Sequence, residues 1–138
     1  MTKKDVQRYL DQNYDCKYII NKNELQVIQN EETYNIKLVK VEKNGMICVN
    51  SKTIWDIRSG RPNGIRYTTT SSRLLDLSEF VKKENPIILL TNKPYRITQA
   101  INESDVEFIT DKNKVHNIMY THNINEIGEI ISVISKKE

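Results

Sequence analysis

The sequence predicts an α/β fold with a mixed sheet (α+β), in a single domain that covers residues 1–138. Short apolar segments of strand length, such as MICV and PIILL, alternate with segments in which apolar residues recur at helical spacing. A chain of 138 residues with 38% hydrophobic and 28% charged residues can also bury one core, and it is too apolar for a disordered chain.

The N-terminal part of the chain predicts one helix and two short strands. Residues 2–13 predict the helix, because Val6, Tyr9 and Leu10 are spaced to share one face. KYII (17–20) and ELQVIQ (24–29) predict the strands. The sequence Asn-Lys-Asn between them predicts a turn, since asparagine favours turn conformations.

The next two apolar segments predict a β-hairpin. TYNIKLVKVE (33–42) and GMICVN (45–50) are joined by Lys43-Asn44-Gly45, which has the residues typical of a tight turn. The run MICV is apolar at consecutive positions, so both faces of this strand are expected to be covered. This strand should therefore lie in the centre of its sheet.

Residues 71–85 predict a second helix. A pair of serines supplies its cap, Glu79 and Lys83 are spaced to form an ion pair, and Pro86 ends it. Its buried side is expected to consist of Leu74, Leu77 and Val81.

The remaining segment predicts shorter elements and a C-terminal helix. PIILL (86–90) predicts a buried strand, residues 91–104 a turn with a short helix, and residues 106–109 and 114–122 two further strands. In the final segment, Asn123 and Glu126 resemble a helix cap, followed by a stripe of isoleucines at helical spacing: Ile124, Ile127, Ile131 and Ile134.

Positive charge is concentrated between residues 52 and 73. This segment contains Lys52, Arg58, Arg61, Arg66 and Arg73 against Asp56 alone. A guanidinium group can donate two hydrogen bonds to one phosphate. The segment 57–73 is therefore interpreted as a loop that wraps a phosphate backbone, with Tyr67 and Trp55 stacking on bases. The alternative is an exposed connecting loop, with Trp55 packed in the core.

The stretch NIKLVKVEKNGMICVNSK (35–52) carries a family resemblance. It resembles the signature of the nuclease-related domain, in which an acidic E-I-D strand and an N-G turn lead into an apolar strand that ends in E-x-K. Here the three places hold Asn35-Ile36-Lys37, Asn44-Gly45 and Asn50-Ser51-Lys52. The element order up to residue 90 is likewise similar to the restriction-endonuclease-like (PD-(D/E)xK) superfamily. The resemblance implies an αβββαβ core of that type with a C-terminal helix.

Both acids that would bind metal in that family are replaced, by Lys37 and Asn50. Mg²⁺ requires carboxylate oxygens, so a site of amines and an amide should repel the metal and attract anions. We therefore expect no catalytic residue, metal or cofactor, and a catalytically inactive nuclease-like domain that binds nucleic acid or another phosphate-bearing partner. The expected binding residues are Lys37, Asn50, Lys52, Arg58, Arg61, Arg66, Arg73 and Tyr67.

Two other functions remain open at this point. The first is a protein-interaction or regulatory module of the same fold. The second is an active metal-dependent nuclease that uses displaced acids, for which Glu32, Glu42 and Asp56 are the nearest candidates. The sequence decides neither between DNA and RNA nor the oligomeric state.

The remaining signals point to ordinary structural roles. Cys16 and Cys48 are too few for a disulfide framework, and His116 and His122 form a weak metal motif. No apolar run approaches the roughly 20 residues that cross a bilayer, and the start MTKKDVQRYL lacks a secretory signal, so a cytoplasmic location with no membrane partner is expected.

Overall fold

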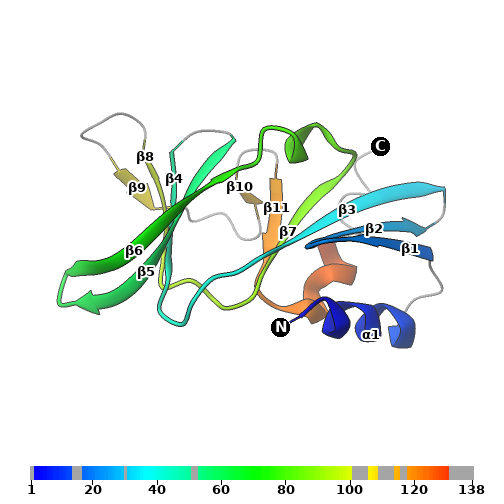
Figure 1. Ribbon diagram of the computed structural model, residues 1–138, viewed down its shortest axis with the longest axis horizontal. Coiled ribbons are helices and arrows are strands. Elements are labelled where there is room, and N and C mark those ends of the chain that lie inside the picture. The colour runs from blue at the N-terminus through cyan, green and yellow to red at the C-terminus, as the bar shows by residue number, and fades with distance from the viewer. Residues whose placement is uncertain are drawn as a thin grey trace.

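The computed structural model describes residues 2–13, 17–29, 31–50, 53–100, 106–108, 114–115 and 118–130. Within these residues the chain forms two mixed β-sheets and few helices, as the α/β prediction requires (Figure 1). We call them sheet A, with the strand order β1-β2-β3-β7-β11-β10, and sheet B, with the order β6-β5-β4-β8-β9.

Sheet A contains the strands predicted on either side of the first turn. Its strands are β1 (Lys17–Asn21), β2 (Glu24–Gln29), β3 (Glu32–Val39), β7 (Pro86–Leu90), β10 (Lys114–Val115) and β11 (Ile118–Thr121). Lys22 has a φ of 55° in the β1–β2 turn, which confirms the turn predicted there. β7 lies between β3 and β11 and runs parallel to both.

Sheet B is built around the apolar strand MICV. Its strands are β4 (Met46–Val49), β5 (Ile54–Asn63), β6 (Arg66–Asp76), β8 (Ile97–Ala100) and β9 (Val106–Phe108). β4 lies between β5 and β8, and all four of its residues are buried. The prediction of a central strand is confirmed, and Cys48 is a buried free thiol.

The predicted hairpin between residues 33 and 50 is wrong. A turn does form, because Asn44 has a φ of 63° and the Gly45 N–H donates to the Glu42 carbonyl oxygen at 2.8 Å. However, β3 belongs to sheet A and β4 to sheet B, so the turn carries the chain between sheets. The β7–β8 connection crosses beside it, and there the Tyr95 N–H donates to the Gly45 carbonyl oxygen at 2.7 Å.

The predicted helix over residues 71–85 is also wrong. Residues 71–76 belong to β6, where successive β-branched and hydroxyl side chains favour a strand. Only a 3-10 turn, η1 (Phe80–Lys82), follows in the described part of this segment. Leu74 is 69% exposed instead of buried, and Lys83 pairs with Glu24 at 3.1 Å instead of Glu79. Competing tertiary contacts override the helical spacing.

Two apolar clusters cover the faces of sheet A. Helix α1 (Lys3–Asn13) forms as predicted and packs Val6 and Leu10 against one face, together with Ile127 and Ile130 from the C-terminal segment. The other cluster joins the two sheets, with Ile88 and Leu90 from sheet A and Ile47, Val49 and Trp55 from sheet B. The prediction of a single domain stays a prediction, and this shared cluster is consistent with it.

The elements predicted for the C-terminal part of the chain are confirmed only in part. Residues 97–100 form β8, so the short helix predicted in 91–104 is wrong for these residues. The strand predicted over 114–122 is the antiparallel pair β10 and β11. The predicted cap is present, because the Asn125 N–H donates to the Asn123 side chain at 3.0 Å at the start of the 3-10 helix η2 (Ile124–Glu126). Ile131 and Ile134 lie outside the described residues.

Candidate anion-binding site

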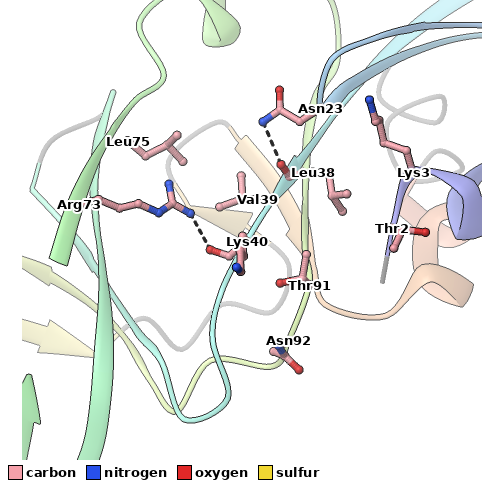
Figure 2. A pocket seen from close by; sticks show the side chains of 10 residues that line it. All are labelled: Thr2, Lys3, Asn23, Leu38, Val39, Lys40, Arg73, Leu75, Thr91 and Asn92. Carbon is pink, nitrogen blue, oxygen red and sulfur yellow. Dashed lines mark hydrogen bonds between the residues drawn. The ribbon is translucent and has the colours of Figure 1, made fainter. Parts of the chain in front are cut away.

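A pocket of about 600 Å³ opens where sheet A, sheet B and the start of α1 meet (Figure 2). Its apolar lining consists of Leu38, Val39 and Leu75. Its uncharged polar lining consists of Thr2, Asn23, Thr91 and Asn92. The pocket lies beside the connections between the sheets, because Val39 is the last residue of β3 and Thr91 directly follows β7.

The charged lining of this pocket is cationic. It consists of Lys3 at the start of α1, Lys40 directly after β3, and Arg73 in β6. No acidic side chain is among the described residues that line the pocket. Glu42 lies next to the pocket, where its carboxylate pairs with the Lys40 ammonium at 3.3 Å. Three basic side chains against this one carboxylate leave the region of the pocket with a net positive charge.

Arg73 is held in place by the backbone. Arg73 is exposed, its register places it on the same face of the hairpin as Ile57, and its Nη2 donates to the Lys40 carbonyl oxygen at 2.7 Å (Figure 2). A smaller hollow of about 210 Å³ shares Arg73 and Lys40 with the pocket, and its other lining residues are Glu42, Ile57, Ser59, Ser71 and Ser72. The guanidinium therefore lies between two hollows, and a fixed guanidinium loses less entropy on binding an anion.

The start of α1 contributes a lysine and little dipole charge. The Thr2 N–H donates to the Asp5 carboxylate at 2.8 Å, and the Asp5 N–H donates to the Thr2 hydroxyl at 3.3 Å. The backbone and side-chain hydrogen bonds from Thr2 hold the pKa of Asp5 below its usual value. The Asp5 carboxylate already neutralises the partial positive charge at the N-terminal end of α1. The positive charge that α1 brings to the pocket therefore comes from the Lys3 ammonium.

Lys37 and Asn50 belong to different sheets. Lys37 lies on β3 in sheet A, with its ammonium 3.8 Å from the Glu24 carboxylate and 5.8 Å from the centre of the Phe80 ring. Asn50 follows β4 in sheet B, is exposed, and its N–H donates to the Ile54 carbonyl oxygen at 3.0 Å. The turn between them changes sheets, so they lie on or beside strands of different sheets, and the expectation that both line one former metal site stays a prediction. Lys52 lies outside the described residues.

The predicted arginine loop is an extended hairpin. β5 and β6 pair from Ile54 opposite Asp76 to Asn63 opposite Arg66, and this hairpin reaches beyond the rest of sheet B (Figure 1). Arg61 and Arg66 are exposed near its end, whereas the Arg58 Nε lies 2.9 Å from the Asp56 carboxylate. Of the predicted arginines, Arg58 is therefore already paired.

The two aromatic residues proposed to stack on bases are both engaged within the protein. Trp55 is 0% exposed and belongs to the core between the sheets, so its proposed stacking role is wrong. Tyr67 donates from its hydroxyl to the Asn44 carbonyl oxygen at 2.5 Å, and its ring stacks on Tyr95 at 5.9 Å between centres. Burial raises the pKa of Tyr67 above its usual value. Tyr67 thus braces the hairpin.

The acids considered as displaced metal ligands lie in separate contacts. Tyr34 donates to the Glu32 carboxylate, Lys40 pairs with Glu42, and Arg58 pairs with Asp56. Within the described ranges, no group of three or more His, Cys, Asp or Glu side chains is placed to hold a metal. His122 is exposed, and Cys16 and His116 lie outside these ranges.

Two residues that line the pocket, Lys3 and Lys40, were not predicted from the sequence. Lys3 lies at the start of α1 and Lys40 directly after β3, and neither belongs to a motif in the sequence. The tertiary fold brings them to Arg73, which the sequence did single out. No sequence signal other than their charge identifies them.

Comparison of the chain with protein-family models, with curated proteins and with solved structures gave no match in any of the three. In the described part of the chain, no helix combines the length and apolar character needed to cross a membrane.

Proposed function

We propose that the protein is a non-catalytic module that binds nucleic acid or another phosphate-bearing partner. The observation that supports this most directly is the pocket in which Arg73 is fixed over the Lys40 carbonyl oxygen, beside the side chains of Lys3 and Lys40. Three basic side chains around one pocket, one of them a guanidinium that is hydrogen-bonded to the backbone, attract phosphate more strongly than an isolated surface charge does.

Strand β6 extends this positive site into a track. Arg66 and Arg73 lie seven positions apart on one strand, which corresponds to roughly 23 Å. Thr68 and Ser71 lie opposite Arg61 and Ser59, on the same face of the hairpin as the two arginines. Both residues are exposed, so their hydroxyls can donate to phosphate oxygens. A track of this length spans several phosphates of one nucleic-acid strand, so a polymer fits it better than a free ion.

Salt dependence tests this function. Fluorescence anisotropy with labelled single-stranded and duplex oligonucleotides should show an affinity that falls by about 0.7 to 0.9 log units per log unit of salt for each phosphate contact. A titration with inorganic phosphate and a phosphopeptide measures whether the partner must be a nucleic acid. Equal, weak retention of all of these probes at about 50 mM and 300 mM salt would remove the proposal.

A second function, a protein-interaction or regulatory module, is favoured by one observation. β6 is the terminal strand in the order of sheet B, and nearly all of its residues are exposed. A long edge strand of this kind can pair with a strand from another protein. Capture of a stoichiometric protein partner from native lysate, after nuclease treatment has removed nucleic acid, would favour this function over the first.

The restriction-endonuclease-like core remains a prediction, and the strand β6 in the place of its second helix counts against it. The active-nuclease alternative requires carboxylates that converge on one metal. Glu42 and Asp56 are instead each paired with a basic side chain, Lys40 and Arg58 respectively. We therefore rank this alternative below the other two.

A further inference from the structure

We propose that the tip of the β5–β6 hairpin enters a groove of duplex DNA and inserts Ile65 as an apolar wedge between base pairs. This inference rests on the proposed nucleic-acid function and specifies its substrate as double-stranded DNA. It concerns a different part of the chain from the pocket, so variants can test the two separately.

The tip presents a large apolar side chain to solvent. Asn63 pairs with Arg66, which leaves Gly64 and Ile65 as the two turn residues. Gly64 has a φ of 64°, and glycine at the first central position is typical of a type II′ hairpin turn. Ile65 is 93% exposed, so its side chain gains nothing from the core. A turn needs no isoleucine at this position, and polar residues are the usual choice.

Two arginines flank this isoleucine. Arg61 and Asn63 are alternate residues of β5, and Asn63 lies opposite Arg66, so Arg61 and Arg66 share one face of the hairpin. Both are exposed. Proteins that kink DNA combine such basic side chains, which contact phosphates, with an apolar residue that partly unstacks a base step.

Contacts of Tyr67 with the rest of the protein hold the hairpin near its tip. Tyr67, opposite Pro62, donates to the Asn44 carbonyl oxygen at 2.5 Å and stacks on Tyr95. Farther from the tip, a bulge between Ser59 and Gly60 increases the twist of the hairpin. There the Thr70 hydroxyl donates to the Ser59 carbonyl oxygen at 3.1 Å. A preformed arm retains binding energy that a flexible loop would lose to ordering, and this energy can be used to deform DNA.

The shape of the arm favours duplex DNA over other anionic surfaces. A two-stranded β-ribbon can enter either groove of duplex DNA, and an apolar wedge acts from the minor groove, where it opens a base step and bends the duplex. Duplex RNA, in contrast, is recognised mostly by shape, through phosphate and 2′-hydroxyl contacts. An anionic membrane is a poorer match, because burial of one isoleucine supplies roughly 2 to 3 kcal/mol and stable attachment needs a larger apolar face. The Arg61 and Arg66 contacts to phosphate suit either groove of DNA.

The test compares Ile65→Ser with Leu74→Ser in the full chain. Leu74 is 69% exposed on the same hairpin but far from the tip, so it controls for the loss of any exposed apolar side chain. A DNA duplex of about 20 base pairs carries a fluorophore on each end, so that energy transfer reports bending and anisotropy reports affinity. A duplex RNA of the same length and anionic phosphatidylserine vesicles are run in parallel.

We expect the wild-type protein to bind and bend duplex DNA. Ile65→Ser should lose the bend and roughly tenfold in affinity, with an unchanged salt slope, while Leu74→Ser behaves as wild type. Equal bending by the wild type and Ile65→Ser would overturn the wedge but leave the proposed function intact. Equal affinity for duplex RNA, or vesicle binding that depends on Ile65, would overturn the choice of DNA. An absence of salt-dependent binding to any nucleic acid would remove the proposed function itself.

Discussion

The guanidinium Nη2 of Arg73 donates a hydrogen bond of 2.7 Å to the backbone carbonyl oxygen of Lys40. This bond links the edge strand of sheet B to the end of β3 in sheet A, at the point where the chain changes sheets. It also places a fixed positive charge between two hollows. The same contact thus joins the two sheets and organises the candidate site.

Arg73→Gln should weaken binding of the nucleic acid or phosphate-bearing partner, because the glutamine amide carries no charge. If Arg73 contacts one phosphate, the slope of log affinity against log salt should become shallower by roughly 0.9 on duplex DNA. Arg8→Gln is the matched control, since Arg8 is 68% exposed on α1 and pairs with Asp5 instead of lining the pocket. Equal loss in both variants, measured by anisotropy, would show a general charge effect and contradict a specific role of Arg73.

Lys37→Gln should leave that binding unchanged. Lys37 is engaged with Glu24 and the Phe80 ring, and it does not line the pocket. Because Lys83 also pairs with Glu24, loss of one partner should lower the free energy of unfolding by less than about 1 kcal/mol in urea denaturation. Binding reduced as strongly as in Arg73→Gln would instead support the former metal site that the sequence resemblance suggested.

Gly60→Ala should destabilise the protein more than Gly64→Ala, although both glycines lie in the same hairpin. A Cβ at Gly60 would lie 2.0 Å from the Thr68 carbonyl oxygen, while nothing lies within 4 Å of one at Gly64. We expect a loss of roughly 2 to 3 kcal/mol for Gly60→Ala from steric overlap. Gly64→Ala should lose about 1 kcal/mol, because its φ of 64° is unfavourable for alanine. The reverse order in urea denaturation would contradict the bulge at Gly60.

Acid should weaken the cap of α1 through Asp5. The pKa of Asp5 is lowered in the folded protein by hydrogen bonds from Thr2, so ionised Asp5 stabilises the fold. This stabilisation is complete above the unfolded pKa of about 3.9, and it is lost as the pH falls through the lower folded pKa. Thr2→Val should raise the pKa of Asp5, measured by NMR titration of the carboxyl carbon. An unchanged pKa in this variant would contradict the reciprocal cap.

Divalent metal should not convert the protein into a nuclease. Plasmid DNA incubated with Mg²⁺ or Mn²⁺ should stay intact, and chelation with EDTA should leave both the melting temperature and nucleic-acid affinity unchanged. The reason is that Glu42 and Asp56 are paired with cations instead of facing each other across a metal. Metal-dependent cleavage that disappears in Lys52→Ala would establish the nuclease alternative.

The sequence predicts local structure well where one pattern acts without competition. The apolar face of α1, the turn at Lys22 and the buried strand MICV are all found where the residues indicate them. In each case the signal lies within a few residues: helical spacing, turn chemistry or a continuous apolar run. Asn44-Gly45 likewise predicts a turn correctly.

The local pattern fails at residues 71–85, where two readings compete. Helical spacing of leucines and the β-propensity of TTTSS point to different structures, and pairing with β5 decides for a strand over residues 71–76. The ten-residue length of β5 offers a complete partner, which the short window of a helical pattern does not reveal.

The sequence by itself determined the α/β class, the buried strands and the concentration of arginines near residue 60. Only the tertiary structure decided that the turn at Asn44 changes sheets, which separates Lys37 from Asn50. It also brought Lys3, Lys40 and Arg73 to one pocket. Turn residues fix the direction of the chain over a few bonds, whereas the choice of neighbouring strand depends on apolar surfaces contributed by distant segments.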